Sequence, residues 1–261
     1  MIDAASPALM SPALTWSEPE SVAVVMQSRE HGDPVDPFTR IGLSPERQIS
    51  TADVDETASM PLTSVVVLYP GCTIAEVIEL TTRLAGFEAE VVVAAVDGAP
   101  IEDQSGLRML PDVTIAALDP AGVDLVVVPG GDPGSVIDDL QMLGFLEAAD
   151  SAGATTAAIC AGVLLVAAAG LVTGRHITHN YRAPWAPEEV ERFVDRFWTD
   201  AVVEPDPTVG VVVDGALVTA LPNATVDFTV TVLETVGRVD GTRGDHLRTH
   251  LRGGFVAELH G

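Results

Sequence analysis

The sequence contains no lysine, and all 13 of its basic residues are arginine. This absence excludes enzymes that hold their substrate as a Schiff base on lysine, and it excludes the P-loop, whose lysine binds phosphate. The 38 acidic residues give the chain a formal net charge of -25. Such a charge repels nucleic-acid phosphates and anionic lipid, so we expect binding neither to nucleic acid nor to a membrane surface.

The acidic excess without lysine has two interpretations. It is typical of proteins from salt-loving microorganisms, whose surfaces carry many hydrated carboxylates. A GC-rich genome also replaces lysine with arginine, through its codon usage. The size of the charge favours the halophilic interpretation, which predicts that salt stabilises the fold by screening repulsion among the carboxylates.

Cysteine is also scarce, since only Cys72 and Cys160 occur. Two cysteines exclude a secreted disulfide scaffold, and we expect a cytoplasmic protein. No basic segment followed by an apolar one opens the sequence, so we expect no signal peptide. Residues 152–172 are long enough to span a membrane and carry no charge, but they consist largely of Ala, Gly and Thr. We expect them to form a buried strand followed by a buried helix.

The composition predicts three segments. Residues 1–62 are acidic and rich in proline, which predicts a weakly ordered extension in which SVAVVM (21–26) is able to form one strand or helical turn. An equal alternative is a start site assigned upstream of the true domain. Residues 63–237 form the predicted α/β domain, and residues 238–261 form a C-terminal tail. The tail carries His246 and His250 at helical spacing, but without a third ligand we expect a solvated tail and no metal site.

Apolar runs alternate with amphipathic stretches throughout the predicted domain. The strands are apolar on both faces and are separated by helices, which predicts a parallel sheet covered by helices on both sides. A hairpin around Asp214-Gly215 within 202–220 and a closing helix at 223–237 complete the pattern. The predicted strands are 64–69, 90–96, 124–131 and 154–160, and the predicted helices are 73–86, 132–153 and 161–172.

Cys160 lies where the last of these strands meets the following helix. A residue at such a turn is exposed at the carboxyl edge of the sheet, where α/β proteins bind ligands. The small neighbours Ala161 and Gly162 allow a tight turn, and the N-terminus of the helix predicts a lowered pKa for the thiol. The alternative is a structural cysteine in an alanine-rich core.

The segment Pro129-Gly130-Gly131 ends the preceding strand. Glycines at this position let the backbone approach a ligand, and their N–H groups are able to face a developing oxyanion. An ordinary turn between a strand and a helix is the alternative.

Three segments in this order resemble the ThiJ/PfpI superfamily, which has the class I glutamine amidotransferase-like fold. They are LYPGCTIAE (68–76), VVVPGG (126–131) and AAICAGVLLVAAAGLVTGRHITH (157–179), the last being the most specific. The resemblance covers roughly residues 63–237. It implies that Cys160 is the nucleophilic, easily oxidised cysteine of the family. It also implies that Glu76 is the acid bonded to the sulfur and that His179 is the histidine of the T-H segment.

These implied roles leave several details open. A Glu76 side chain between apolar strand ends should have a raised pKa and serve as a proton shuttle, although without the resemblance Glu79 would be an equal candidate. The group that orients His179 remains open among Asn180, Glu188, Glu189 and a group of a partner subunit. Cys72 is able to resolve an oxidised Cys160 as a disulfide, but a packed bystander is favoured.

The resemblance is not equal across subfamilies. The protease-like members have a histidine directly after the nucleophile, where this chain has Ala161. The isonitrile hydratases usually have threonine there, although their F-P-G-x-T-x-x-D run resembles residues 69–76. The glyoxalase III-like and redox-protective members have C-A-G, as this chain does. No His-x-Glu pair follows Cys160, so we do not expect glutamine hydrolysis.

The predicted protein is therefore a doubly wound α/β domain with a flavodoxin-like parallel sheet, and the resemblance implies a homodimer. Its expected function is a cysteine enzyme, needing no cofactor, that acts on a small-molecule electrophile such as an α-oxoaldehyde or an isonitrile. The alternative is a redox-responsive stress protein that uses an oxidisable cysteine. The predicted catalytic residues are Cys160, Glu76 and His179, and the predicted oxyanion or substrate-binding residues are Gly130, Gly131 and Ala161.

Overall fold

The computed structural model describes residues 62–253 of the chain. The expectations for residues 1–61, including the segment 21–26, lie outside these residues, as does the end of the predicted tail.

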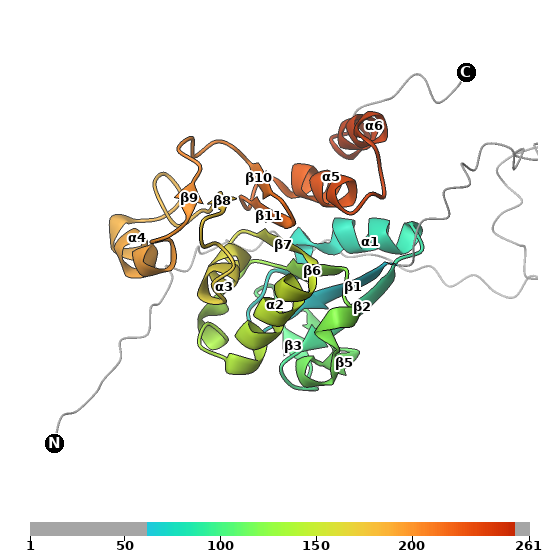
Figure 1. Ribbon diagram of the computed structural model, residues 1–261, viewed down its shortest axis with the longest axis horizontal. Helices are drawn as coiled ribbons and strands as arrows, with labels where there is room; N and C mark the ends of the chain where they lie inside the picture. The colour runs from blue at the N-terminus through green and yellow to red at the C-terminus, as the bar shows by residue number, and fades with distance from the viewer. Residues whose placement is uncertain (1–61, 254–261) are drawn as a thin grey trace, which may run out of the picture. The chain divides into compact units, whose positions relative to one another are not determined.

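A seven-stranded, mostly parallel sheet forms the centre of this part of the chain (Figure 1). Its order is β10-β11-β7-β6-β1-β2-β5, and β10 is its one antiparallel strand. The order of β2, β1, β6, β7 and β11 is that of flavodoxin, so the predicted fold is confirmed. The strands are β1 (Thr63–Val67), β2 (Glu90–Ala95), β5 (Val113–Thr114), β6 (Leu125–Val128), β7 (Thr155–Ile159), β10 (Val211–Asp214) and β11 (Leu217–Ala220).

The three central strands β1, β6 and β7 are buried on both faces, as their continuous apolar runs predict. Val66 of β1 lies opposite Val127 of β6, and Val128 of β6 lies opposite Ala158 of β7. Because the three strands are parallel and in register, the segments that follow them meet at one edge of the sheet.

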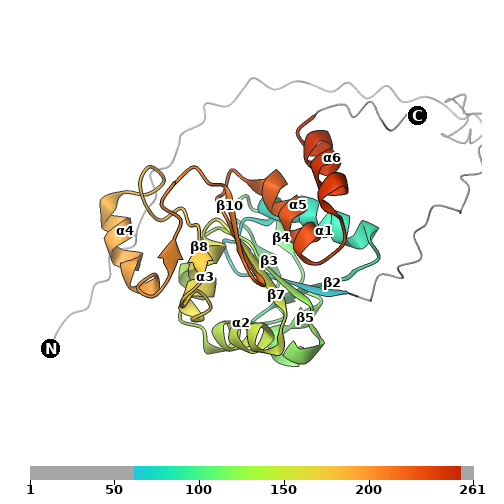
Figure 2. The same ribbon diagram turned by 45° about the horizontal axis from the view of Figure 1, so that its top comes forward.

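Helices cover both faces of the sheet. Figures 1 and 2 show α1 (Ile78–Gly86), α5 (Thr225–Thr235) and α6 (Gly241–Leu251) on one face. The same views place α2 (Leu140–Ala152) and α3 (Gly162–Ala168) on the other face. No helix within residues 62–253 is long and apolar enough to cross a membrane. Residues 152–172 contain strand β7 and helix α3, as expected.

Two predicted helices begin later in the structure. The helix expected from 132 begins at Leu140, because Asp139 caps it by accepting from the N–H groups of Gln141 and Met142. The helix expected from 73 begins at Ile78, after a 3-10 turn over Ile74–Glu76. This change of phase buries Leu80 and leaves Ile78 48% exposed.

The expectation of a solvated tail is wrong for residues 241–251, which form α6. Leu247 and Leu251 of this helix contact the core, and Arg248 forms an ion pair with Glu234 of α5 at 2.6 Å. His246 and His250 both belong to α6. Among the residues that the structure describes, no group of three or more His, Cys, Asp or Glu side chains is placed to hold a metal ion.

Residues 176–203 form a small lobe that the sequence analysis did not predict. It contains β8 (His176–Ile177), α4 (Glu188–Val194), a 3-10 turn over Asp195–Phe197 and β9 (Val202–Val203). Strands β8 and β9 form a separate parallel pair. A second small pair, β3 (Ile101–Glu102) and β4 (Arg108–Met109), is antiparallel. The lobe lies beside α3 in Figure 1.

Candidate active site

Cys160 occupies a strained turn between β7 and α3. Its φ of 57° lies in the left-handed region, which few residues other than glycine adopt. Its backbone N–H donates to the carbonyl of Ala220 at 2.8 Å, which holds the turn against β11. A Cβ at Gly162 would lie 2.5 Å from the carbonyl oxygens of Val128 and Pro129, so only glycine lets α3 begin this close to β6. The predicted turn is therefore present, and the fold maintains its strain.

Glu76 lies beside the Cys160 sulfur, as the family resemblance implies. Its Oε2 accepts from the Gly130 N–H at 2.8 Å, and its carboxyl group hydrogen-bonds the thiol. A Cβ at Gly130 would lie 2.5 Å from Oε2 and 2.8 Å from Sγ, so the two reactive atoms converge over this glycine. The other candidate, Glu79, instead forms an ion pair with Arg83.

The glycine turn after β6 contributes differently at each residue. The N–H groups of Gly131 and Ala161 bond the sulfur, which stabilises negative charge on the sulfur itself, and their binding of an oxyanion stays a prediction. The Gly130 N–H donates to Glu76, so Gly130 orients the acid. The same N–H is then not available for an oxyanion, contrary to the prediction. The Gly130 carbonyl accepts from the buried Tyr69 hydroxyl at 2.7 Å, which holds the turn from the other side.

Burial dominates the electrostatics of the acid and the thiol. It raises the pKa of Glu76, although hydrogen bonds from Cys160 and Gly130 act in the opposite direction. Burial, followed by the charge of Glu76, raises the pKa of Cys160 to about 12. The predicted lowering by the helix N-terminus is therefore wrong, because the seven-residue α3 does not outweigh these two effects. The predicted raised pKa of Glu76 is confirmed in direction.

Each of the two groups opposes the ionisation of the other, so the pair retains one proton over a wide pH range. The ordinary pKa values favour a proton on sulfur by about 4 units, or about 6 kcal/mol. The sulfur, however, receives bonds from Gly131, Ala161 and a side-chain amide, whereas the carboxylate receives one from Gly130. Two additional bonds to a charged group contribute about 1.5–3 kcal/mol each. These bonds offset part of that difference, but burial and the charge of Glu76 still hold the pKa of the thiol at about 12, so the shared proton rests on the sulfur and a shuttle has to move it to Glu76.

The amide on the sulfur belongs to Asn180, which we expected only as a candidate partner of His179. Its Nδ2 lies 3.7 Å from Sγ and donates to it. Tyr181 is also close to the site, since burial and then the charges of Cys160 and Asp132 raise the pKa of its hydroxyl. Nothing in the sequence pattern distinguishes either residue, because both follow a strand of only two residues.

His179 is placed differently from the prediction. The residue is 4% exposed, its ring stacks on Trp198 with ring centroids 4.3 Å apart, and its Nδ1 accepts from the Tyr181 N–H at 3.1 Å. Burial and then the charge of Arg182 lower its pKa to about 4, so the ring is neutral at pH 7. No hydrogen bond joins His179 to Cys160 within residues 62–253, and its assistance in catalysis remains a prediction.

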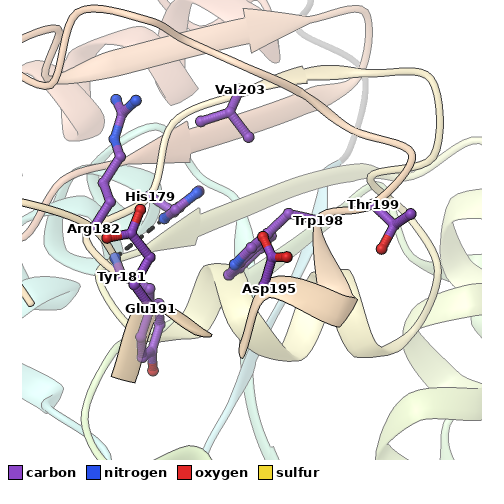
Figure 3. A pocket seen from close by; sticks show the side chains of 8 residues that line it. All are labelled: His179, Tyr181, Arg182, Glu191, Asp195, Trp198, Thr199 and Val203. Carbon is purple, nitrogen blue, oxygen red and sulfur yellow. Dashed lines mark hydrogen bonds between the residues drawn. The ribbon is translucent and has the colours of Figure 1, made fainter. Parts of the chain in front are cut away.

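His179 borders a cavity of about 480 Å³, shown in Figure 3, which we call the lobe cavity. It lies between the segment after β8 and the α4 side of the lobe. Its lining residues are His179, Tyr181, Arg182, Glu191, Asp195, Trp198, Thr199 and Val203.

Cys72 is fully buried as a free thiol and forms an isolated β-bridge with Gly131. Its position supports the favoured interpretation as a packed residue, and burial raises the pKa of its thiol.

Comparison with known proteins gives a consistent result. The model of the DJ-1/PfpI family matches residues 63–235. Protein dj-1beta of Drosophila melanogaster is 30% identical over 122 residues, covering 46% of this chain and 65% of the relative. The isonitrile hydratase of Pseudomonas putida is 30% identical over 86 residues, covering 33% of this chain and 37% of the relative. The glutathione-independent glyoxalase DJR-1.2 of Caenorhabditis elegans is 29% identical over 91 residues, covering 34% of this chain and 49% of the relative. The chain thus spans less than two thirds of each of these three relatives.

Among solved structures, a DJ-1 superfamily protein from Agrobacterium tumefaciens superposes with a TM-score of 0.62 at 25% identity. The superposition covers 74% of this chain and 98% of that protein. The two chains therefore share the fold over almost the whole of the smaller one.

Proposed function

Because this chain belongs to the DJ-1/PfpI family, we propose that it is a cysteine-dependent enzyme that acts on a small electrophilic carbon. The observation that carries the proposal is the contact between the Cys160 thiol and the buried carboxyl group of Glu76 at the sheet edge. A nucleophile beside a group that takes and returns a proton is the minimum that covalent catalysis needs. Relatives named isonitrile hydratase and glyoxalase support this class of reaction.

With an α-oxoaldehyde, the sulfur of Cys160 bonds to the aldehyde carbon, and the proton held by the pair passes to the carbonyl oxygen. Glu76 then removes the hydrogen of this carbon as a proton and returns it to the neighbouring keto carbon, while the proton of the new hydroxyl group moves to the keto oxygen, which forms the thioester of a 2-hydroxy acid. Water cleaves the thioester and restores the thiol. One carbon is oxidised and its neighbour reduced, so the reaction consumes one water and needs no external oxidant.

With an isonitrile, the sulfur bonds to the terminal carbon, and Glu76 delivers the proton to the same carbon, which forms a thioimidate. Water then adds to that carbon and the thiol leaves, so the product is the N-substituted formamide. The N–H groups of Gly131 and Ala161 and the amide of Asn180 stabilise the sulfur whenever it carries negative charge.

The second candidate is a redox-responsive protein whose Cys160 is oxidised. The same hydrogen bonds that stabilise a thiolate favour it, because oxidation requires thiolate character. The enzyme is better supported, because a shared proton between Glu76 and Cys160 serves a transfer to and from a substrate.

The test is turnover of methylglyoxal and of an alkyl isonitrile by the wild-type chain and by two matched variants. Cys160→Ser should abolish turnover, whereas Cys72→Ser, which changes the other, fully buried thiol, should retain it. Product is measured as 2-hydroxy acid or formamide by NMR. Equal activity in wild type and Cys160→Ser would contradict the proposal.

A further inference from the structure

The lobe cavity lies next to the candidate active site, because one short segment contributes to both. Asn180 donates to Sγ of Cys160 at 3.7 Å, whereas its chain neighbours His179 and Tyr181 line the cavity. In Figure 3 the Tyr181 side chain extends away from His179, and its hydroxyl group lies at the far end. Tyr181 therefore borders the cavity and also lies close enough to Cys160 that, after burial, the charge of the thiolate raises the pKa of its hydroxyl.

We propose that the lobe cavity binds the substituent carried by the electrophilic carbon on which Cys160 acts. The inference rests on the proposed function and adds a substrate class to it. The expected substrates are uncharged electrophiles whose substituent is about the size of an aromatic ring and contains a hydrogen-bond acceptor.

The volume of the cavity supports a substituent of this size. At about 480 Å³ it falls within the range of about 300–1,000 Å³ that small-molecule pockets occupy. A water-sized group takes about 30 Å³, so the five non-hydrogen atoms of methylglyoxal would fill about a third of it. A three-carbon aldehyde therefore leaves most of the cavity without contacts.

The walls offer apolar surface and one fixed donor. The rings of Tyr181 and Trp198 lie 6.1 Å apart, and Val203 closes the apolar part. Because Nδ1 of His179 accepts from the Tyr181 N–H, the proton of the neutral imidazole lies on Nε2. In Figure 3 this second nitrogen lies on the side of the ring away from Tyr181, toward Val203. An uncharged acceptor, such as a carbonyl or ether oxygen, matches that N–H.

The charges around the cavity disfavour an anionic substituent. Two carboxylates, Glu191 and Asp195, line it against the single guanidinium of Arg182. The Nε and Nη2 atoms of Arg182 are buried, so they are not presented to a ligand. The net charge of -25 on the whole chain acts in the same direction.

Alkylation of Cys160 tests the proposal directly, without depending on turnover. In each reaction the sulfur displaces iodide, so an S–C bond forms, a C–I bond breaks and the thiol proton passes to Glu76 or to water. Three reagents are compared by mass spectrometry: iodoacetamide, N-benzyliodoacetamide and iodoacetate. Each rate is divided by the rate of the same reagent with free cysteine.

The normalised rate of N-benzyliodoacetamide should exceed that of iodoacetamide by about tenfold, an effect that even one methylene has in a well-fitting pocket. It should also saturate with concentration, and iodoacetate should be the slowest of the three. Equal normalised rates for the benzyl reagent and iodoacetamide, without saturation, would overturn the proposal.

Two neighbouring valines of β9 provide a matched pair of variants. Val203 lines the cavity, whereas Val202 is 58% exposed and faces the other way, as alternate residues of a strand do. Val203→Trp should remove the tenfold preference and the saturation, and Val202→Trp should retain both. If Val203→Trp lowers the rates of N-benzyliodoacetamide and iodoacetamide equally, Thr199→Trp at the exposed rim of the cavity is the deciding variant. A Thr199→Trp chain that keeps the full preference for the benzyl reagent would overturn the proposal.

The outcomes separate this inference from the proposed function. If neither aldehyde nor isonitrile is turned over and Cys160 reacts no faster than Cys72, both proposals are wrong. If either substrate is turned over but the benzyl reagent shows no preference, only the role of the cavity is wrong.

Discussion

Replacing Glu76 with glutamine should change the pH dependence of Cys160 alkylation more than its rate at any one pH. Sγ and Oε2 lie within 2.8 Å and 2.5 Å of a single point over Gly130, so they are no more than about 5 Å apart. At that distance and an effective dielectric constant of about 20, two charges interact by about 3 kcal/mol, or about 2 pKa units. An interaction of this size makes the two groups titrate as one pair.

In the wild-type chain, the pair holds one proton between the raised pKa of Glu76 and the pKa of about 12 for Cys160. The thiolate fraction is then nearly constant, and the alkylation rate should change less than about threefold from pH 6.5 to 8.5. In Glu76→Gln the thiol must lose its proton to water, and burial still raises its pKa. The rate should therefore rise about tenfold per pH unit, or about 100-fold over the same interval.

The assay is iodoacetamide labelling in a series of buffers, with Cys160 and Cys72 quantified in the same digest. Glu79→Gln is the matched control, because Glu79 lies on the same segment but bonds Arg83 at the surface. Its profile should coincide with that of the wild-type chain. Parallel profiles for wild type and Glu76→Gln would refute the shared proton. A rate that stays constant with pH in Glu76→Gln but not in the wild-type chain would show that Glu76 is not the group that shares the proton of the thiol.

Three further predictions concern the glycine turn, the buried histidine and the acidic surface. Gly130→Ala should abolish turnover, because its Cβ would lie 2.5 Å from Glu76 Oε2. The control Gly144→Ala in α2, where a Cβ would meet nothing within 4 Å, should stabilise the fold by about 0.5–1 kcal/mol in chemical denaturation. The pKa of His179 falls from 6.5 to about 4 on folding, so the unfolded chain binds the proton first and stability is lost as pH falls through this interval. Between pH 7 and 5 the wild-type chain should lose about 2 kcal/mol more unfolding free energy than His179→Gln, and equal losses would contradict the lowered pKa. With a net charge of -25, the melting temperature should rise markedly from low to molar salt, and a flat profile would leave codon usage as the reason for the missing lysine.

The central sheet and the position of Cys160 could be predicted because they depend on local patterns. Uninterrupted apolar runs such as LVVV (125–128) are buried on both faces, and parallel order brings their ends together. Glu76 required the family resemblance, since a helix carboxylate looks the same at 76 and 79 in the sequence. The structure separates the two by the Gly130 N–H, which binds only Glu76.

The lobe and α6 could not be predicted, because their contacts join residues far apart in the sequence. Strands β8 and β9 have two residues each, too few for an alternation to be recognised. Helix α6 is largely polar, and beside Leu247 and Leu251 it is attached by ion pairs of Arg248 with Glu234 and of Arg252 with Asp227. The pKa of Cys160 was wrongly predicted for the same reason, since the helix N-terminus is visible in the sequence but burial is not.

The last prediction separates the enzyme from the redox protein, using Glu76→Asp. The shorter side chain keeps an acid but withdraws it by about 1 Å, away from both the Gly130 N–H and the Cys160 sulfur. A misplacement of this size costs an enzyme about 10²-fold, and loss of the proton transfer in Glu76→Gln costs about 10²–10⁴-fold. Oxidation of Cys160 by peroxide needs only thiolate, so in both variants it should follow the alkylation rate and not the turnover. If the wild-type chain turns over neither methylglyoxal nor an isonitrile, yet oxidises selectively at Cys160, the enzyme is the wrong choice. The shared proton would then serve to keep a sensor cysteine partly ionised.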